Sequence, residues 1–278
     1  MRALATLSYV ACAAVGALAP AAASAQPQAV EAAIIEGAPS SHRAVAALLD
    51  ASDAVYCSGT LIAPDAVLTA AHCVDEETPR LAHFAGAEGA PVLVRAWQSH
   101  PDYDPRALSA DLAILWLDEP VAHITPQPLL ETSMDETWVG RAVRVVGHGL
   151  TSSEELSSDG AQRERLTTIE RVEPERVRHG PSSCDGDSGG AVLDEADGTL
   201  VAVISSGPRG CAFYGRATRI DAHRAWLVGA LARGAPEPMS CAMRPARHRT
   251  SSLWCASALA ITAALARRKE ARGRRARQ

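Results

Sequence analysis

The nine residues SSCDGDSGG, at positions 182–190, form the most informative pattern in this chain. Ser188 lies among three glycines, and glycine allows positive φ angles that bring a backbone close to a ligand. In such a turn the N–H groups of Gly186 and Ser188 can converge on one point and stabilise negative charge that develops there. An ordinary tight turn has the same composition, so the pattern becomes informative only with partners elsewhere in the sequence.

Two other stretches supply such partners. LTAAHC at 68–73 places His72 beside a cysteine after an apolar run, and DLAIL at 111–115 places Asp111 before another apolar run. Serine is a weak nucleophile unless a base removes its proton, and histidine, which titrates near neutrality, is a suitable base. A carboxylate can then fix the imidazole tautomer and stabilise the imidazolium. In the order His, Asp, Ser, these residues predict a nucleophilic serine site.

The remaining central sequence favours short β-strands. Apolar runs of four to eight residues recur between turn residues, at 45–50, 58–63, 66–71, 91–97, 112–117, 142–149, 191–194 and 200–207. This punctuation predicts an all-β sandwich or barrels. One helix is expected at 222–233, with Asp221 as its N-cap and Gly234 after its end. The polar stretches 151–162 and 170–180 are expected to form surface loops.

In combination, the motifs resemble those of the chymotrypsin/trypsin-like serine protease family over about residues 34–233. CSGTLIAPDAVLTAAHC at 57–73 resembles the family's histidine block, HPDYDP followed by DLAIL its aspartate block, and SSCDGDSGG its serine block. VVGHGLT and ISSG resemble two further family segments. The resemblance implies two six-stranded antiparallel β-barrels with a C-terminal helix, and a boundary between the barrels near residues 130–140.

The resemblance also implies a role for each residue of the three blocks. His72 is the general base and acid, Asp111 orients it, and Ser188 is the nucleophile. The N–H groups of Gly186 and Ser188 form the oxyanion hole. Ser205 supports the aspartate beside the strand that receives the substrate. The implied enzyme is a serine-type endopeptidase that acts on a peptide or protein substrate.

The position that the family uses as the floor of its specificity pocket is Ser182. Without a charged group there, a strong preference for Arg or Lys before the scissile bond is not expected. Ser183 and Gly207 leave the pocket wall open, so an uncharged apolar residue can enter. Ala212 is expected to narrow the pocket.

Four of the seven cysteines lie between the two ends of the chain, which allows two disulfides in three pairings. The resemblance implies the pairing Cys57–Cys73 and Cys184–Cys211. IIEG at 34–37 resembles the mature N-terminus of the family. Activation would then expose the Ile34 amine, which would pair with Asp187 and neutralise a carboxylate that is costly to bury alone.

The N-terminal end of the chain has the features of an export signal. A secretory signal peptide over residues 1–25 is predicted by Arg2, the apolar stretch 3–19 and the sequence Ala23-Ser24-Ala25. Residues 26–33 would form a short propeptide before the protease domain at 34–233. Because Ala33 precedes the cut, the activating protease need not be trypsin-like.

Residues 234–278 are expected to form a linker and a C-terminal sorting or anchor tail. This stretch contains, in order, a Pro-rich break, Cys241, the apolar run 253–266 and a basic end. They resemble the Cys–hydrophobic–Arg sorting tails of some exported Gram-negative proteins. The fourteen apolar residues are short of the roughly 20 that span a bilayer. A solvated tail without a role is the alternative. The protein is expected to be secreted or at the cell surface, with membrane contact only through this tail.

Composition excludes other functional classes. The 278 residues carry a net charge of −5, and residues 241–278 hold ten of the basic residues and one acidic residue, so the rest is strongly acidic. An acidic domain is not expected to bind nucleic acid. CxxC and HExxH motifs are absent, so neither a metal nor a cofactor is expected. A catalytically inactive homologue that acts as a binding module is the main alternative. An esterase is less favoured. In esterases with a GxSxG elbow the serine precedes the Asp and the His, whereas in this chain the order is His, Asp, Ser.

Overall fold

The computed structural model describes residues 34, 37–84, 90–150, 160–208 and 213–236. This part of the chain is built mainly of short strands, with a 3₁₀ turn at Glu136–Trp138 and helices α2 (Ala71–Glu76) and α3 (Ile220–Arg233). The strands are β1 (Ala38–Pro39), β2 (Val45–Leu49), β3 (Val55–Ala63), β4 (Ala66–Thr69), β5 (Leu81–Phe84), β6 (Val92–Ser99), β7 (Ala113–Leu117), β8 (Ala142–Gly147), β9 (Arg163–Val172), β10 (Arg176–His179), β11 (Ala191–Asp194), β12 (Leu200–Ser206) and β13 (Gly215–Arg219).

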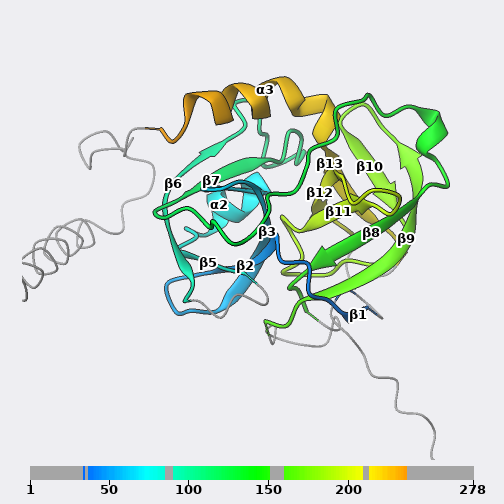
Figure 1. Cartoon of the computed structure of the whole chain (residues 1–278). Helices are drawn as coiled ribbons and strands as arrows, with labels where there is room; N and C mark the ends of the chain where they lie inside the picture. The colour runs from blue at the N-terminus through cyan, green and yellow to red at the C-terminus, as the bar shows by residue number, and fades with distance from the viewer. Residues whose placement is uncertain (1–33, 35–36, 85–89, 151–159, 209–212, 237–278) are drawn as a thin grey trace, which may run out of the picture. The chain divides into compact units, whose positions relative to one another are not determined.

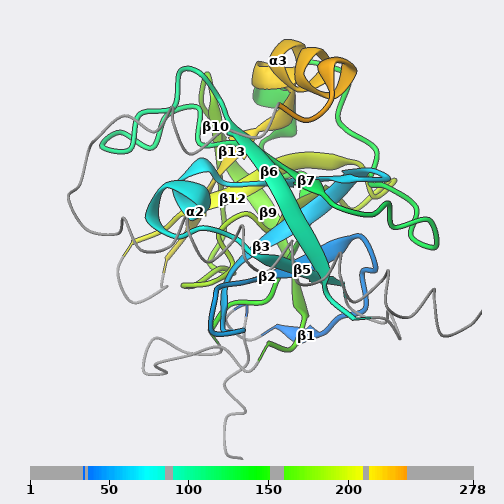
Figure 2. The ribbon, with the colours of Figure 1, turned by 90° about the vertical axis from the view of Figure 1, so that its left-hand side faces the viewer.

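The strands close into two antiparallel barrels (Figure 1). In the first barrel, which faces the viewer in Figure 2, the order is β2-β3-β4-β7-β6-β5, and β2 pairs with both β3 and β5. In the second, the order is β9-β10-β13-β12-β11-β8, and pairing of β8 with β9 closes the ring. β1 adds to the outer edge of β9. These pairings confirm the predicted fold of two six-stranded barrels and a C-terminal helix.

Strands β4 and β7 are buried along their whole length because both of their faces are covered. Val67 and Leu115 belong to the core of the first barrel. Leu68 and Ile114 belong to a second cluster, which also contains second-barrel residues such as Val143. Burial on both faces explains why these runs are continuously apolar rather than alternating. The barrels therefore pack together through β4 and β7, and chain segments at the ends of these strands reach the junction.

The prediction of a surface loop at 170–180 is wrong. Most of that stretch lies in β9 and β10, which pair with each other. Ile169 and Val177 are buried, whereas the half-buried Arg178 and the exposed Glu170 form an ion pair of 3.0 Å. The charged residues of these strands thus lie on the outer side of the barrel, and their number obscured the alternation in the sequence.

Helix α3 confirms the prediction of a helix that ends before Gly234, whose φ of +74° suits a helix end. The predicted N-cap is wrong, because Arg219 caps the helix and Asp221 lies in the first turn. Asp221 instead accepts a hydrogen bond of 2.8 Å from the Met134 N–H and pairs with Arg219 at 2.6 Å. Its carboxylate therefore ties the helix to the segment between the barrels. Among the described residues, neither helix has the length and apolar character needed to cross a bilayer.

Candidate active site

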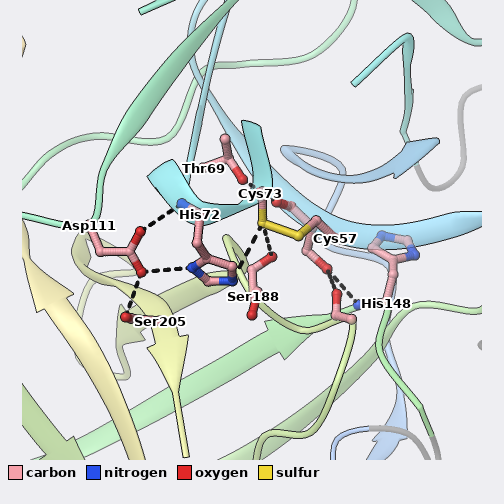
Figure 3. Close-up of a disulfide and its surroundings, with 10 residues drawn as sticks. Cys57, Thr69, His72, Cys73, Asp111, His148, Ser188 and Ser205 are labelled. Carbon is pink, nitrogen blue, oxygen red and sulfur yellow. Dashed lines mark hydrogen bonds and ion pairs between the residues drawn. A yellow bond between two sulfur atoms is a disulfide. The ribbon is translucent and has the colours of Figure 1, made fainter. Parts of the chain in front are cut away.

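The side chains of His72 and Asp111 meet at the junction of the barrels (Figure 3). His72 lies in the first turn of α2, just after β4, and Asp111 lies two residues before β7. Asp111 Oδ2 accepts hydrogen bonds from His72 Nδ1 at 2.8 Å and from Ser205 Oγ at 2.6 Å. Asp111 Oδ1 accepts from the His72 backbone N–H at 2.9 Å. Three donors thus satisfy a fully buried carboxylate, which would be costly to bury without them.

These contacts fix the tautomer of His72. An ionised carboxylate only accepts hydrogen bonds, so the proton of the neutral imidazole lies on Nδ1. Nε2 is then an acceptor that can take a second proton, and Asp111 would stabilise the resulting imidazolium. Ser205 comes from β12 of the second barrel, so both barrels contribute to the hydrogen-bonded series Ser205–Asp111–His72.

Ser188 lies beside the imidazole of His72 in Figure 3, and both residues line one cavity of about 570 Å³. The same cavity is lined by Gly186 and Ser183 from the serine loop and by Ser205 and Gly207 at the end of β12. The structure therefore brings together the predicted nucleophile, base and orienting carboxylate. It also opens a space beside them in which a substrate could lie.

The conformation of the serine loop requires glycine at two positions. Gly186 has φ +88° and Gly189 has φ +83°. A Cβ at Gly189 would lie 2.1 Å from the Ser58 carbonyl oxygen, and one at Gly186 would lie 2.9 Å from the Cα of Gly149. Within the described residues, the N–H groups of Gly186 and Ser188 make no hydrogen bond to another protein group. Both donors are therefore free to bind a ligand atom that carries negative charge.

Ser58 and Thr69 hold the serine loop against the first barrel, a role that the sequence did not reveal. The Ser58 N–H donates to the Ser188 carbonyl at 2.8 Å, and Ser58 Oγ donates to the Gly186 carbonyl at 3.0 Å. Ser58 Oγ accepts from the His148 N–H at 2.9 Å, and Thr69 Oγ1 donates to the Ser58 carbonyl at 2.8 Å. Both residues lie within the 57–73 stretch, but nothing in the motif separates them from ordinary strand residues.

Asp187, next to the predicted nucleophile, is fully buried. Its carboxylate accepts hydrogen bonds from the N–H groups of Cys184 and Gly149, each at 2.8 Å. Burial nevertheless raises the pKa of Asp187 to about 7, because two neutral donors only partly replace water around the charged form. Ile34 is also fully buried. The site thus contains an acid whose ionised form would be stabilised by a nearby cation.

The predicted pocket residues differ in exposure. Ser183 and Gly207 line the cavity, whereas Ser182 is fully buried and its Oγ contacts the Gly180 carbonyl oxygen and His179 Nδ1, both at 3.0 Å. Ala212 lies outside the described residues.

Cys57 in β3 and Cys73 in α2 form a disulfide that closes a separation of 16 residues. Cys184 is disulfide-bonded as well, and its predicted partner Cys211 lies outside the described residues. The two sulfur atoms of the first disulfide and a ring nitrogen of His72 lie within 4.8 Å of one another. Sulfur atoms in a disulfide are not thiolates, so this cluster does not offer the ligands that zinc prefers.

Comparison with known proteins relates most of this chain to a described family. The family profile described as Trypsin matches residues 34–227. Trypsin iota of Drosophila melanogaster is 28% identical over 200 residues, which cover 63% of this chain and 78% of the relative. The vitellin-degrading protease of Bombyx mori is 30% identical over 200 residues, which cover 62% of this chain and 74% of the relative.

Solved structures show the same fold. The atomic-resolution structure of HBP matches with a TM-score of 0.62 at 25% identity, covering 74% of this chain and 100% of the other. The structure of human heparin binding protein matches with a TM-score of 0.61 at 24% identity, with the same coverage.

Proposed function

Since this chain belongs to the trypsin family of serine proteases, we propose that it is an exported serine endopeptidase that hydrolyses peptide bonds through an acyl-enzyme. The observation that carries the proposal is the hydrogen-bonded series Ser205–Asp111–His72, which orients an imidazole in the same cavity as Ser188. An oriented base beside a serine is the arrangement that activates a hydroxyl as a nucleophile.

In the first half of the reaction, Ser188 Oγ attacks the carbonyl carbon of the scissile peptide and His72 Nε2 takes the hydroxyl proton. The electron pair of the carbonyl π bond moves to oxygen. As the tetrahedral intermediate collapses, the C–N bond breaks and His72 transfers the proton to the leaving amine. An ester of Ser188 remains. Asp111 stays ionised and stabilises the imidazolium during both transfers.

In the second half, water replaces the amine. His72 takes a proton from water as its oxygen attacks the ester carbon, and it returns the proton to Ser188 Oγ when the ester bond breaks. In both halves the negative oxygen would lie against the N–H groups of Gly186 and Ser188. These donors need no reorganisation because the φ angles of Gly186 and Gly189 already fix the loop.

The environment of Asp187 supports activation by cleavage as part of this proposal. Cleavage between Ala33 and Ile34 would create an α-amine, whose pKa is ordinarily about 8. Full burial of Ile34 and of Asp187, and the raised pKa of that carboxyl, support an ion pair between them after cleavage. The pair would hold Asp187 ionised and so keep both of its bonds to backbone N–H groups. Residues 26–33 would then be a propeptide removed by a separate protease.

The substrate preference proposed for this site is an uncharged residue before the scissile bond. Ser182, Ser183 and Gly207 supply hydroxyl and backbone groups but no ion to pair with Arg or Lys. The substrate is a peptide or protein, and no metal or cofactor enters the mechanism.

Export is part of the same proposal. The signal peptide (1–25), the propeptide (26–33) and nearly all of the tail (234–278) lie outside the described residues. The protein is proposed to be secreted or held at the cell surface, with the domain at 34–233 carrying the activity. The tail would be cleaved or would serve as an anchor.

The test uses chain purified with Ile34 as its first residue. We expect the wild-type protein to cleave a library of unlabelled peptides, as detected by mass spectrometry of the products. Ser188→Ala should lower the initial rate by at least about 10³-fold. Ser133→Ala, at an exposed serine that is distant in sequence from Ser188, is the matched control and should not change the rate. A folded, processed wild-type chain that cleaves no peptide would contradict the proposal and would favour a binding module.

A further inference from the structure

His179 lies next to the pocket, although it belongs to none of the sequence motifs. It is the last residue of β10 and pairs with Gly215 in β13. A Cβ at Gly215 would lie 2.2 Å from His179 Cε1 and 2.6 Å from His179 Nε2. The edge of the imidazole therefore fills the space that a side chain at position 215 would occupy.

Two contacts hold the imidazole in this orientation. His179 Nδ1 lies 3.0 Å from the Gly180 carbonyl oxygen and 3.0 Å from Ser182 Oγ. A carbonyl oxygen only accepts hydrogen bonds, so the proton of the neutral ring lies on Nδ1. Nε2 is a buried acceptor without a hydrogen-bond partner in the described part of the chain. Burial lowers the pKa of His179 to about 4, which keeps the ring neutral at physiological pH.

The same imidazole edge lies close to the cavity. Ser183, which lines the cavity, has its Oγ 2.7 Å from the position that a Gly215 Cβ would take. His179 Cε1 and Nε2 lie within 2.6 Å of that same position. The cavity extends to Ser183 but not to Ser182 or His179, both of which are fully buried. The imidazole edge thus lies close to the hydroxyl group of a residue that lines the cavity.

We propose that His179 closes the pocket for the residue before the scissile bond and restricts that residue to a short, uncharged side chain, such as that of Ala, Ser, Thr or Val. This inference rests on the proposed endopeptidase function and names its substrate class. A long aliphatic or aromatic side chain would need the space that the imidazole fills. A charged side chain would meet a neutral ring and two hydroxyl groups, with no opposite charge to replace its lost hydration.

The test compares peptide amides that differ only in the residue before the scissile bond: Ala, Val, Leu, Phe, Lys and Glu. For the wild-type enzyme we expect kcat/KM for Ala or Val to exceed kcat/KM for Leu and Phe by at least about 30-fold, because the larger side chains need the occupied space. His179→Gly should reverse this preference or lower the ratio at least about tenfold. His83→Gly removes an exposed histidine from β5 and should leave the ratio unchanged.

Two results overturn the inference. One is a wild-type enzyme that prefers Leu, Phe, Lys or Glu, and this result does not depend on whether the variant folds. The other is a folded His179→Gly enzyme with the wild-type ratio. Labelling of Ser188 by a fluorophosphonate, which carries no peptide side chain, separates these results from failure of the proposed function. If the processed wild-type chain takes no label, both proposals fail. If it takes the label but prefers a long side chain before the scissile bond, only the proposal about His179 fails.

Discussion

Asp111 and Asp187 are both fully buried carboxylates, but their surroundings give them different chemistry. Asp111 accepts three hydrogen bonds, from the backbone and ring of His72 and from Ser205. Asp187 accepts two, both from backbone N–H groups, and its pKa is raised to about 7. The first environment suits a carboxylate that orients a base. The second leaves a need for positive charge, which processing at Ile34 would supply.

Asp111→Asn should lower kcat by roughly 10⁴-fold at pH 7. The amide nitrogen of Asn cannot accept from His72 Nδ1, so the imidazole would adopt the tautomer that cannot take the Ser188 proton. Steady-state kinetics on a peptide amide measure the effect. Asp118→Asn, at an exposed aspartate just after β7, is the control. A loss below about tenfold for Asp111→Asn would show that His72 does not depend on this carboxylate.

Ser205→Ala should lower kcat about tenfold without unfolding the protein. The change removes one hydrogen bond of 2.6 Å to Asp111, and bonds to charged groups contribute about 1.5–3 kcal/mol. Two of the three donors to the carboxylate remain. Kinetics and circular dichroism of the variant, beside Ser52→Ala at an exposed turn, give the result. If both variants retain the wild-type kcat, the hydroxyl of Ser205 has no part in orienting Asp111.

At the scale of elements, the sequence predicts the strands whose burial is simple. Both faces of β4 and of β7 are covered by other residues, so these strands are mostly apolar. Their runs at 66–71 and 112–117 could therefore be recognised in the sequence. β9 and β10 were missed because their outer faces carry Arg and Glu in ion pairs, as between Arg178 and Glu170. In the sequence, the charged residues of the outer face count as much as the apolar residues of the inner face, so such a stretch does not look like a strand. The cap of α3 was misplaced by two residues because Asp221 serves a tertiary contact instead.

The disulfide between β3 and α2 should stabilise the fold measurably. Closing a loop over a separation of 16 residues restricts the unfolded chain and contributes about 3 kcal/mol. The double variant Cys57→Ala/Cys73→Ala should therefore lose about 3 kcal/mol in the free energy of unfolding. Denaturant titration of the oxidised wild-type and variant proteins checks this value. A loss below about 1 kcal/mol would mean that the barrel contacts alone fix this region.

At the scale of the whole molecule, the candidate site is assembled from both barrels. His72 and Asp111 come from the first and Ser188 and Ser205 from the second, and all four could be named from the sequence because their motifs resemble those of a known family. The residues that hold these motifs in place could not. Ser58, which holds the serine loop, and His179, whose ring lies against Gly215, contact chain segments that only the folded barrels bring close, and no local pattern marks either residue.

Buried histidines should make the stability of the whole domain depend on pH. Burial lowers the pKa values of His100, His179 and His223, so the unfolded chain binds protons first as the pH falls below about 6.5. These three histidines therefore favour unfolding as the pH falls. For His179, with its pKa of about 4, the loss between pH 7 and pH 5 is about 2 kcal/mol.

The measurement is the free energy of unfolding at pH 7 and pH 5. His179→Gln should lose about 2 kcal/mol less than the wild-type protein between these two values. The comparison between proteins cancels the opposite contribution of Asp187, whose raised pKa favours the folded state on acidification. His83→Gln, at an exposed position, should follow the wild-type protein. Equal pH dependence in all three proteins would mean that His179 is accessible to protons in the folded state.

The most direct test of the central claim, that Ser188 is an activated nucleophile, is mass spectrometry of the processed chain after incubation with a fluorophosphonate. We expect one adduct on the peptide that contains Ser188, in a chain that begins at Ile34, and none in Ser188→Ala. A folded chain that begins at Ile34 and remains unlabelled would contradict it.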